Sequence, residues 1–121
     1  SGVTVATSEL LVRYRPPARH QGGLSMIQVS VLYPKGEGST FDADYYKTKH
    51  RQICFDVMPG LQRMDCFAGI DGPYAAVGHL YFETMEQMAA AMGGPRIAEA
   101  QADLPNYTNV VPVIQISQLT A

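Results

Sequence analysis

The sequence predicts an α+β domain in which two helices cover one face of a four-stranded antiparallel sheet. Alternating apolar and polar residues predict strands at 26–34, 62–70, 74–82 and 111–119. Segments that begin at capping residues predict helices at 42–57 and 84–92. The resulting order, βαββαβ, is that of the ferredoxin-like fold, in which both helices lie on the same face of the sheet.

Turn and cap residues mark where these elements begin and end. Asp42 can cap the first helix, which "MPG" ends after Val57. The turn "DGP" separates the second and third strands at hairpin distance. Thr84 and Gln87 have capping-box spacing for the second helix, which Gly-Gly-Pro ends. A short helical piece at 96–103 and the turn "LPNYTN" then precede the last strand.

Composition limits the domain organisation and the class of function. The chain has 121 residues and a net charge of −2, so it has one core and no basic surface for nucleic acid or an anionic membrane. Residues 1–25 join a Pro-Pro and a Gly-Gly pair without apolar periodicity, and they predict a flexible leader before a domain at 26–121. The two cysteines have no zinc-type spacing, which favours reduced thiols in a cytoplasmic protein.

The predicted sheet has apolar residues on both faces, although helices cover only one. Alternation assigns these residues to two faces: Leu32, Met64, Cys66 and Leu80 to one, and Val31, Phe67, Val77 and Val113 to the other. An uncovered apolar sheet face of this size indicates a partner. We therefore expect a homodimer in which two such faces pack around a two-fold axis.

The first helix carries the strongest candidate for chemistry. Tyr46 and His50 are four residues apart and share the face that should look at the sheet, with Tyr45 on its flank. A histidine there has an ordinary pKa near 6.5, which burial or a carboxylate can shift, so it could transfer protons in an apolar pocket. The alternative is a structural histidine that is hydrogen-bonded to Tyr46 or to the backbone.

Other candidates come from the strands and from the last turn. Asp65 and Phe67 share one face of the second strand, and Asp65 could partner His50 or simply face solvent. His79 could contact a ligand or form a hydrogen bond in the dimer core. Asp103 and Asn106 could brace their turn or point at His50. No phosphate-binding, nucleophile-elbow or metal-binding motif is present, so the sequence gives no support for a cofactor.

Four segments, taken in order, resemble the EthD family, named from ethyl tert-butyl ether degradation. They are "FDADYYKTKH", "MPGLQRMDCFAGIDG", "YAAVGHLYFETMEQM" and "AQADLPNYTNVVPVIQIS". The resemblance implies a dimeric α+β barrel with a pocket between helices and sheet in each subunit. The family's motif histidine matches His50, and its tyrosine pair matches Tyr45 and Tyr46. Its late aspartate and asparagine match Asp103 and Asn106. Relatives often continue with a Pro-Leu-like pair after the histidine, where this chain has "RQICFD", so we expect the helix to run on unbroken.

Three hypotheses about function follow. The first is a small-molecule enzyme for a hydrophobic compound (aromatic, polyketide-like or from ether degradation), with cofactor-free acid/base chemistry by His50. Tyr46 would orient the histidine or donate to an oxyanion, and Asp103 or Asp65 would set its tautomer. The second is a non-enzymatic ligand-binding accessory protein to an oxygenase system such as a cytochrome P450, which the resemblance implies for EthD proteins. The third is haem binding, with His50 or His79 as axial ligand.

Overall fold

The computed structural model describes residues 26–121, so the leader predicted at 1–25 lies outside the described residues. The described chain forms the predicted order of elements. These are β1 (Ile27–Pro34), α2 (Ala43–Tyr45), the π-helical turn η1 (Tyr46–His50), α3 (Arg51–Val57), β2 (Arg63–Ala68), β3 (Tyr74–Phe82), α4 (Met85–Met92), α5 (Ile97–Ala102), the 3₁₀ turn η2 (Leu104–Asn106) and β4 (Val113–Gln118).

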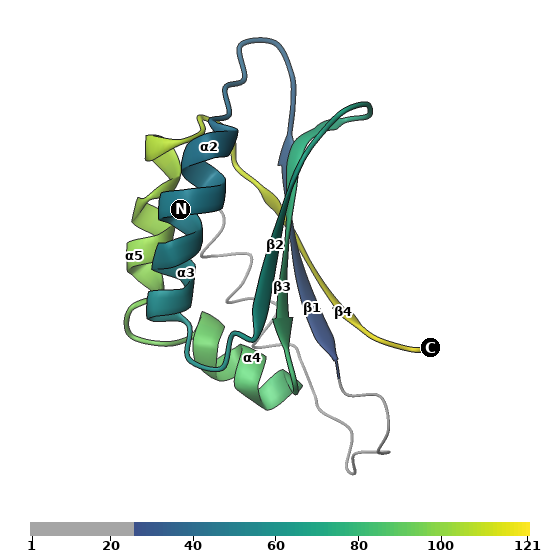
Figure 1. Cartoon of the computed structure of the whole chain (residues 1–121), viewed down its shortest axis with the longest axis vertical. Helices are drawn as coiled ribbons and strands as arrows, with labels where there is room; N and C mark the ends of the chain where they lie inside the picture. Colours follow the sequence, from purple (N-terminus) through teal and green to yellow (C-terminus); the bar gives the residue numbers. More distant parts are fainter. Residues whose placement is uncertain (1–25) are drawn as a thin grey trace.

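The four strands form one antiparallel sheet in the order β2-β3-β1-β4. Figure 1 shows α2, α3 and α5 standing along one side of this sheet, with α4 near its lower end. The prediction of a ferredoxin-like fold with helices on one face is confirmed. No described helix covers the other face, which we call the outer face (Figure 1). Among residues 26–121, no helix has the length and apolar composition needed to cross a membrane.

The core lies between the sheet and the helices. Cross-strand neighbours share a face, and the register pairs Val31 with Gly78 and Leu32 with Val77. The prediction for the first strand was therefore wrong: Val31 faces the helices, while Leu32 belongs to the outer face. The fully buried core side chains with the largest volumes are Tyr33, Phe82, Met88 and Val29.

The first helix runs without a break from α2 through η1 into α3, as expected from the absence of a Pro-Leu pair. Asp42 caps it, because its carboxylate accepts a hydrogen bond from the Tyr45 amide at 3.1 Å. The π turn was not predicted. Its signature is the Arg51 amide, which donates to the Tyr46 carbonyl five residues earlier. Such a turn holds one residue more than an α-helical turn, so it changes which side chains point the same way.

Strand β2 lies at an edge of the sheet, beside the start of α3. Arg51 reaches across to this edge, and its Nε donates to the backbone carbonyl of Met64 at 3.0 Å. The guanidinium also lies over the Phe55 ring, 4.9 Å from the ring centroid. These two contacts fix the Arg51 side chain along the strand.

Candidate functional site

His50 lies at the centre of a buried polar cluster between the first helix and the turn after α5. Only 5% of its surface is exposed, and only 6% of that of Asp103. The Nδ1 atom of His50 is 2.9 Å from an Asp103 carboxylate oxygen. An ionised carboxylate can only accept hydrogen bonds, so this contact places the imidazole proton on Nδ1 and leaves Nε2 as an acceptor.

Asp103 receives two further hydrogen bonds on its other carboxylate oxygen. The Tyr45 hydroxyl donates at 2.7 Å, and the Asn106 side-chain amide donates at 2.9 Å. Burial acts to raise the pKa of Asp103, but the hydrogen bonds from Tyr45, Asn106 and His50 outweigh it, so the net pKa is lowered. The carboxylate is therefore ionised at neutral pH.

The π turn explains how the helix delivers two side chains to this one carboxylate. Tyr45 and His50 are five residues apart, and both bond to Asp103. In a regular α-helix, residues five apart point well away from each other. The extra residue of the π turn brings them back to one side. The same turn stacks the Tyr46 ring on His50, with ring centroids 5.6 Å apart and an interplanar angle of 19°.

The free nitrogen of His50 begins a chain of phenols. Its Nε2 is 3.2 Å from the Tyr107 hydroxyl, which is 2.7 Å from the Tyr33 hydroxyl. Because Nε2 can only accept, Tyr107 donates to it and Tyr33 donates to Tyr107. Burial lowers the pKa of His50 below its ordinary value against the opposing effect of Asp103, so the resting imidazole is neutral. A directed hydrogen-bond chain thus runs from Tyr33 to Asp103.

The Tyr33 end of this chain lies in the wall of a narrow, partly open cavity of about 50 Å³ between the helices and the sheet. Apolar side chains supply most of the wall, including Met58, Met64, Leu80, Met92 and Ile114. Tyr33, Tyr46 and Cys54 also line it. His50 is not among the lining residues, so it reaches the cavity only through its neighbours.

Tyr46 contributes a hydroxyl that lacks a partner within the described part of the chain. The residue is 2% exposed, and its hydroxyl forms no hydrogen bond among residues 26–121. The oxygen lies against Gly78 of β3, where a Cβ atom would overlap it. Burial raises the pKa of this phenol, so it stays protonated and can donate.

Cys54 lines the cavity and also contacts His50. Its sulfur is 3.5 Å from His50 Nε2. Burial raises the pKa of the thiol to about 12. Cys54 is therefore a protonated thiol at neutral pH and not an activated nucleophile.

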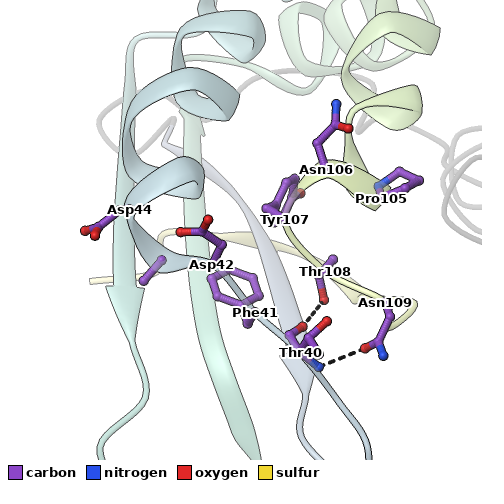
Figure 2. A pocket seen from close by; sticks show the side chains of 10 residues that line it. Thr40, Phe41, Asp42, Asp44, Pro105, Asn106, Tyr107, Thr108 and Asn109 are labelled. Carbon is purple, nitrogen blue, oxygen red and sulfur yellow. Dashed lines mark hydrogen bonds between the residues drawn. The ribbon is translucent and has the colours of Figure 1, made fainter.

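A separate groove, open to solvent, lies on the outside of the polar cluster (Figure 2). Its volume is about 590 Å³, and Figure 2 shows Asp42 and Asp44 on one side and the turn from Pro105 to Asn109 on the other. Hydrogen bonds from the Thr40 amide to Asn109, at 2.9 Å, and from the Thr108 hydroxyl to the Thr40 carbonyl, at 2.7 Å, join its walls. Asn106 and Tyr107 line the groove, so the polar cluster reaches solvent here.

The other predicted site residues lie on the opposite side of the sheet. Asp65, Phe67 and His79 point from the outer face, where Asp65 pairs with His79 in the register. Arg63 holds Asp65 in an ion pair at 3.0 Å, and His79 contacts the Ser30 hydroxyl at 3.0 Å. The hypothesis that Asp65 partners His50 does not fit this geometry, because Asp103 occupies that position.

Sequence reasoning missed Tyr33, Tyr107, Cys54 and Gly78 as members of the site. Tyr107 lies inside the quoted segment "LPNYTN" and Tyr33 inside the strand predicted at 26–34, so both tyrosines were visible but had no assigned role. Both ring nitrogens of His50 already have partners, Asp103 and Tyr107, which does not fit His50 as an axial haem ligand. Within the described residues, no cluster of three or more His, Cys, Asp or Glu side chains could hold a metal ion.

The fold and this cluster define the class of protein: a ferredoxin-like α+β domain with a buried His-Asp pair. The sequence matches no family model and no curated protein, but solved structures do match. An EthD-like protein from Ralstonia eutropha JMP134 is 30% identical, with a TM-score of 0.74, and the match covers 82% of this chain and 96% of that one. The chain therefore belongs to the EthD family.

More distant structures share the fold. An ethyl tert-butyl ether (EthD) family protein from Bacillus halodurans C-125 is 17% identical, with a TM-score of 0.62 over 78% of this chain and 99% of that one. A Bordetella bronchiseptica protein, provisionally assigned as an antibiotic biosynthesis monooxygenase, is 13% identical, with a TM-score of 0.58 over 80% of this chain and 99% of that one.

Proposed function

We propose that the protein binds a small hydrophobic molecule in the cavity between the helices and the sheet and moves a proton to or from it without a cofactor. One observation carries this proposal: the hydrogen-bond chain that joins the buried His50–Asp103 pair, through Tyr107, to Tyr33 in the cavity wall. Such a chain connects a base to a place where a substrate can sit.

The chain allows proton abstraction without forming a phenolate. Tyr33 accepts a proton from an activated carbon of the substrate while its own proton moves to Tyr107. The proton of Tyr107 moves to His50 Nε2. The products are an imidazolium held by Asp103 and two neutral phenols. This route suits the site, because burial raises the pKa of both Tyr33 and Tyr107 and so disfavours phenolates.

Proton abstraction from carbon is the first step shared by isomerisation, dehydration and cofactor-free oxygenation. The related protein provisionally assigned as an antibiotic biosynthesis monooxygenase supports chemistry on small organic molecules. The size of the cavity favours small substrates. Its 50 Å³ is about a third of the roughly 150 Å³ that holds a benzene molecule. An aromatic substrate would require Met58, Met64 or Met92 to move, and methionine is the apolar side chain best able to do so.

The test is hydrogen–deuterium exchange at the α-carbon of small ketones. Acetone, cyclopentanone and acetophenone in D2O are followed by proton NMR with catalytic amounts of protein. We expect exchange above the buffer rate, lost by roughly 100-fold or more in His50→Gln, since general acid–base groups contribute about that much. His79→Gln, on the other side of the sheet, is the matched control and should retain the activity.

The alternative is an accessory protein that holds its ligand for an oxygenase. The observation that favours it is the position of His50, which does not line the cavity, so the polar cluster could serve only to fix the helix and the turn. Ketone binding without any exchange, in the same NMR samples, would select this alternative.

We also propose that two copies pack through their outer faces and that the protein works in the cytoplasm. Leu32, Val77, Phe67 and Val113 form an apolar band across this face, and Phe67 is 54% exposed and Val113 49%. A second copy would remove this band from water. The cytoplasmic location rests on the free thiols of Cys54 and Cys66.

A further inference from the structure

We infer that the Tyr46 hydroxyl donates a hydrogen bond to an oxygen atom of the bound molecule, which makes the ligand an apolar carbonyl compound. This inference rests on the proposed function, because it places the ligand in the same cavity. It adds a specific contact and a substrate class that the proton chain alone does not define.

The first argument is the missing partner. A buried hydroxyl without a hydrogen bond costs free energy, and almost all buried polar groups in native proteins have a partner. Tyr46 is 2% exposed, and no atom of residues 26–121 has full hydrogen-bond geometry with its hydroxyl, although the Tyr33 hydroxyl is a polar neighbour. Phenylalanine would fill the same space without this cost. A ligand that accepts a hydrogen bond from the Tyr46 hydroxyl would supply the missing partner and explain why this position carries a hydroxyl.

The second argument is that the surrounding residues make room for this oxygen and hold it still. A Cβ atom at position 78 would overlap it, so glycine in the middle of β3 creates its space. The ring is fixed between Tyr33, at a centroid distance of 5.3 Å, and His50, at 5.6 Å. Such a hydroxyl is preorganised, as donors to developing negative charge in active sites are.

The third argument is that the cavity then has two complementary groups. Tyr33 and Tyr46 both line it, but Tyr33 donates its proton away from the cavity to Tyr107, while the proton of Tyr46 is not engaged by the described protein. Tyr33 can therefore accept a hydrogen from the ligand, and Tyr46 can donate one to it. The remaining wall is mostly apolar, so a ligand with one oxygen and an adjacent C–H fits both.

A ketone with α-hydrogens uses both groups in one balanced step. The C–H bond breaks and its proton forms a new O–H bond at Tyr33. The C–H electron pair forms the carbon–carbon double bond, and the carbonyl π electrons move to the oxygen. That oxygen becomes an enolate, which holds the hydrogen bond from Tyr46. The proton that leaves Tyr33 ends on His50 through Tyr107.

The experiment compares two probes of the same shape with the wild-type protein and Tyr46→Phe. Cyclopentanone labelled with ¹³C at the carbonyl has the oxygen; methylenecyclopentane has a CH2 group in its place. We expect the carbonyl resonance to move downfield on binding to wild type and this shift to be absent in Tyr46→Phe. The variant should bind the ketone about 3- to 10-fold more weakly and the hydrocarbon at least as well. Tyr33→Phe should keep the carbonyl shift.

Two results would overturn the inference. One is a carbonyl shift and a ketone affinity that are the same in Tyr46→Phe and in wild type, which would mean that the hydroxyl binds only water or another part of the protein. The other is the absence of binding of either probe to wild type.

The inference and the proposed function can fail separately. If His50→Gln loses hydrogen–deuterium exchange and Tyr46→Phe keeps the carbonyl shift of wild type, only the inferred hydrogen bond from Tyr46 to the ligand oxygen is refuted. If the carbonyl shift depends on Tyr46 but the wild-type protein catalyses no hydrogen–deuterium exchange, only the proposed proton transfer is refuted.

Discussion

Tyr33 and Tyr46 are neighbours in the core, yet their hydroxyls should contribute to stability in opposite ways. The Tyr33 hydroxyl bonds to Tyr107, whereas that of Tyr46 has no partner in the described chain. We predict that Tyr33→Phe lowers the free energy of unfolding by about 1 kcal/mol. Tyr46→Phe should leave it unchanged or raise it. Urea denaturation of the ligand-free protein measures both, and a loss in Tyr46→Phe as large as that in Tyr33→Phe would contradict an unpartnered hydroxyl.

His50 should make stability depend on pH in the weakly acidic range. Burial lowers its pKa in the folded protein below 6.5. As the pH falls below about 6.5, the unfolded chain therefore binds a proton that the folded protein resists. The free energy of unfolding should then decrease with falling pH until the folded pKa is passed.

Denaturation at several pH values between 7.5 and 5 measures this dependence. Asp103 does not interfere in that window: its lowered pKa gives a stabilisation that is present above about 3.8 and is lost only as the pH falls further. His50→Gln should flatten the profile. A profile equally steep in His50→Gln would argue against a buried neutral imidazole.

At the scale of elements, β3 and the π turn fit each other at a single point. Gly78 of β3 leaves the space that the Tyr46 hydroxyl of η1 fills. We predict that Gly78→Ala destabilises the protein by about 1–3 kcal/mol, the usual cost of overpacking a core. In a Tyr46→Phe background the same change should cost much less, since the overlapping oxygen is gone. A double-mutant cycle measures this coupling, and additive effects would show that the two residues do not meet.

The strands and capped helices could be predicted because each has a local cause. Alternation located Tyr74–Phe82 with its observed bounds, and Thr84 caps its helix through the Gln87 amide at 3.1 Å. The π turn could not be predicted, because nothing in "YYKTKH" separates it from α-helix. The turn brings Tyr45 and His50 to Asp103, 53 positions from His50, and no local pattern shows a contact of that kind. The face of the first strand was also misassigned, since its register depends on pairing with a strand far along the chain.

The difference between local patterns and long-range contacts also explains which residues of the candidate site the sequence suggested. His50, Tyr46 and Asp103 have chemistry that marks them individually, and the sequence suggested each of them. Tyr33 and Gly78 have roles only through their contacts with distant segments. Tyr33 bonds to the Tyr107 hydroxyl, and Gly78 leaves space for the Tyr46 hydroxyl. Contacts of that kind become visible only when the chain is folded.

At the scale of the whole molecule, helices cover one face of the sheet and none of residues 26–121 forms an element over the other, so this outer face should determine the oligomeric state. We predict that Phe67→Asp converts a dimer into a monomer, because it places a charge in the apolar band of the outer face. Light scattering after size-exclusion chromatography measures the mass. Ile70→Asp is the matched control: Ile70 is 98% exposed at the tip of the β2–β3 hairpin, outside this band. A wild-type monomer, or an Ile70→Asp variant that dissociates equally, would contradict this interface.

The position of the Arg51 side chain affects whether another polypeptide chain can add to the edge of the sheet at high protein concentration. An edge strand with free carbonyl and amide groups is a template on which another chain can add, which is how sheets grow into fibrils. On β2, the Met64 carbonyl is already bonded to Arg51, whose guanidinium is held in place over Phe55. A foreign strand would have to displace this cation first. The contact made by this one residue at the start of α3 should therefore make the addition of a foreign strand beside Met64 less favourable.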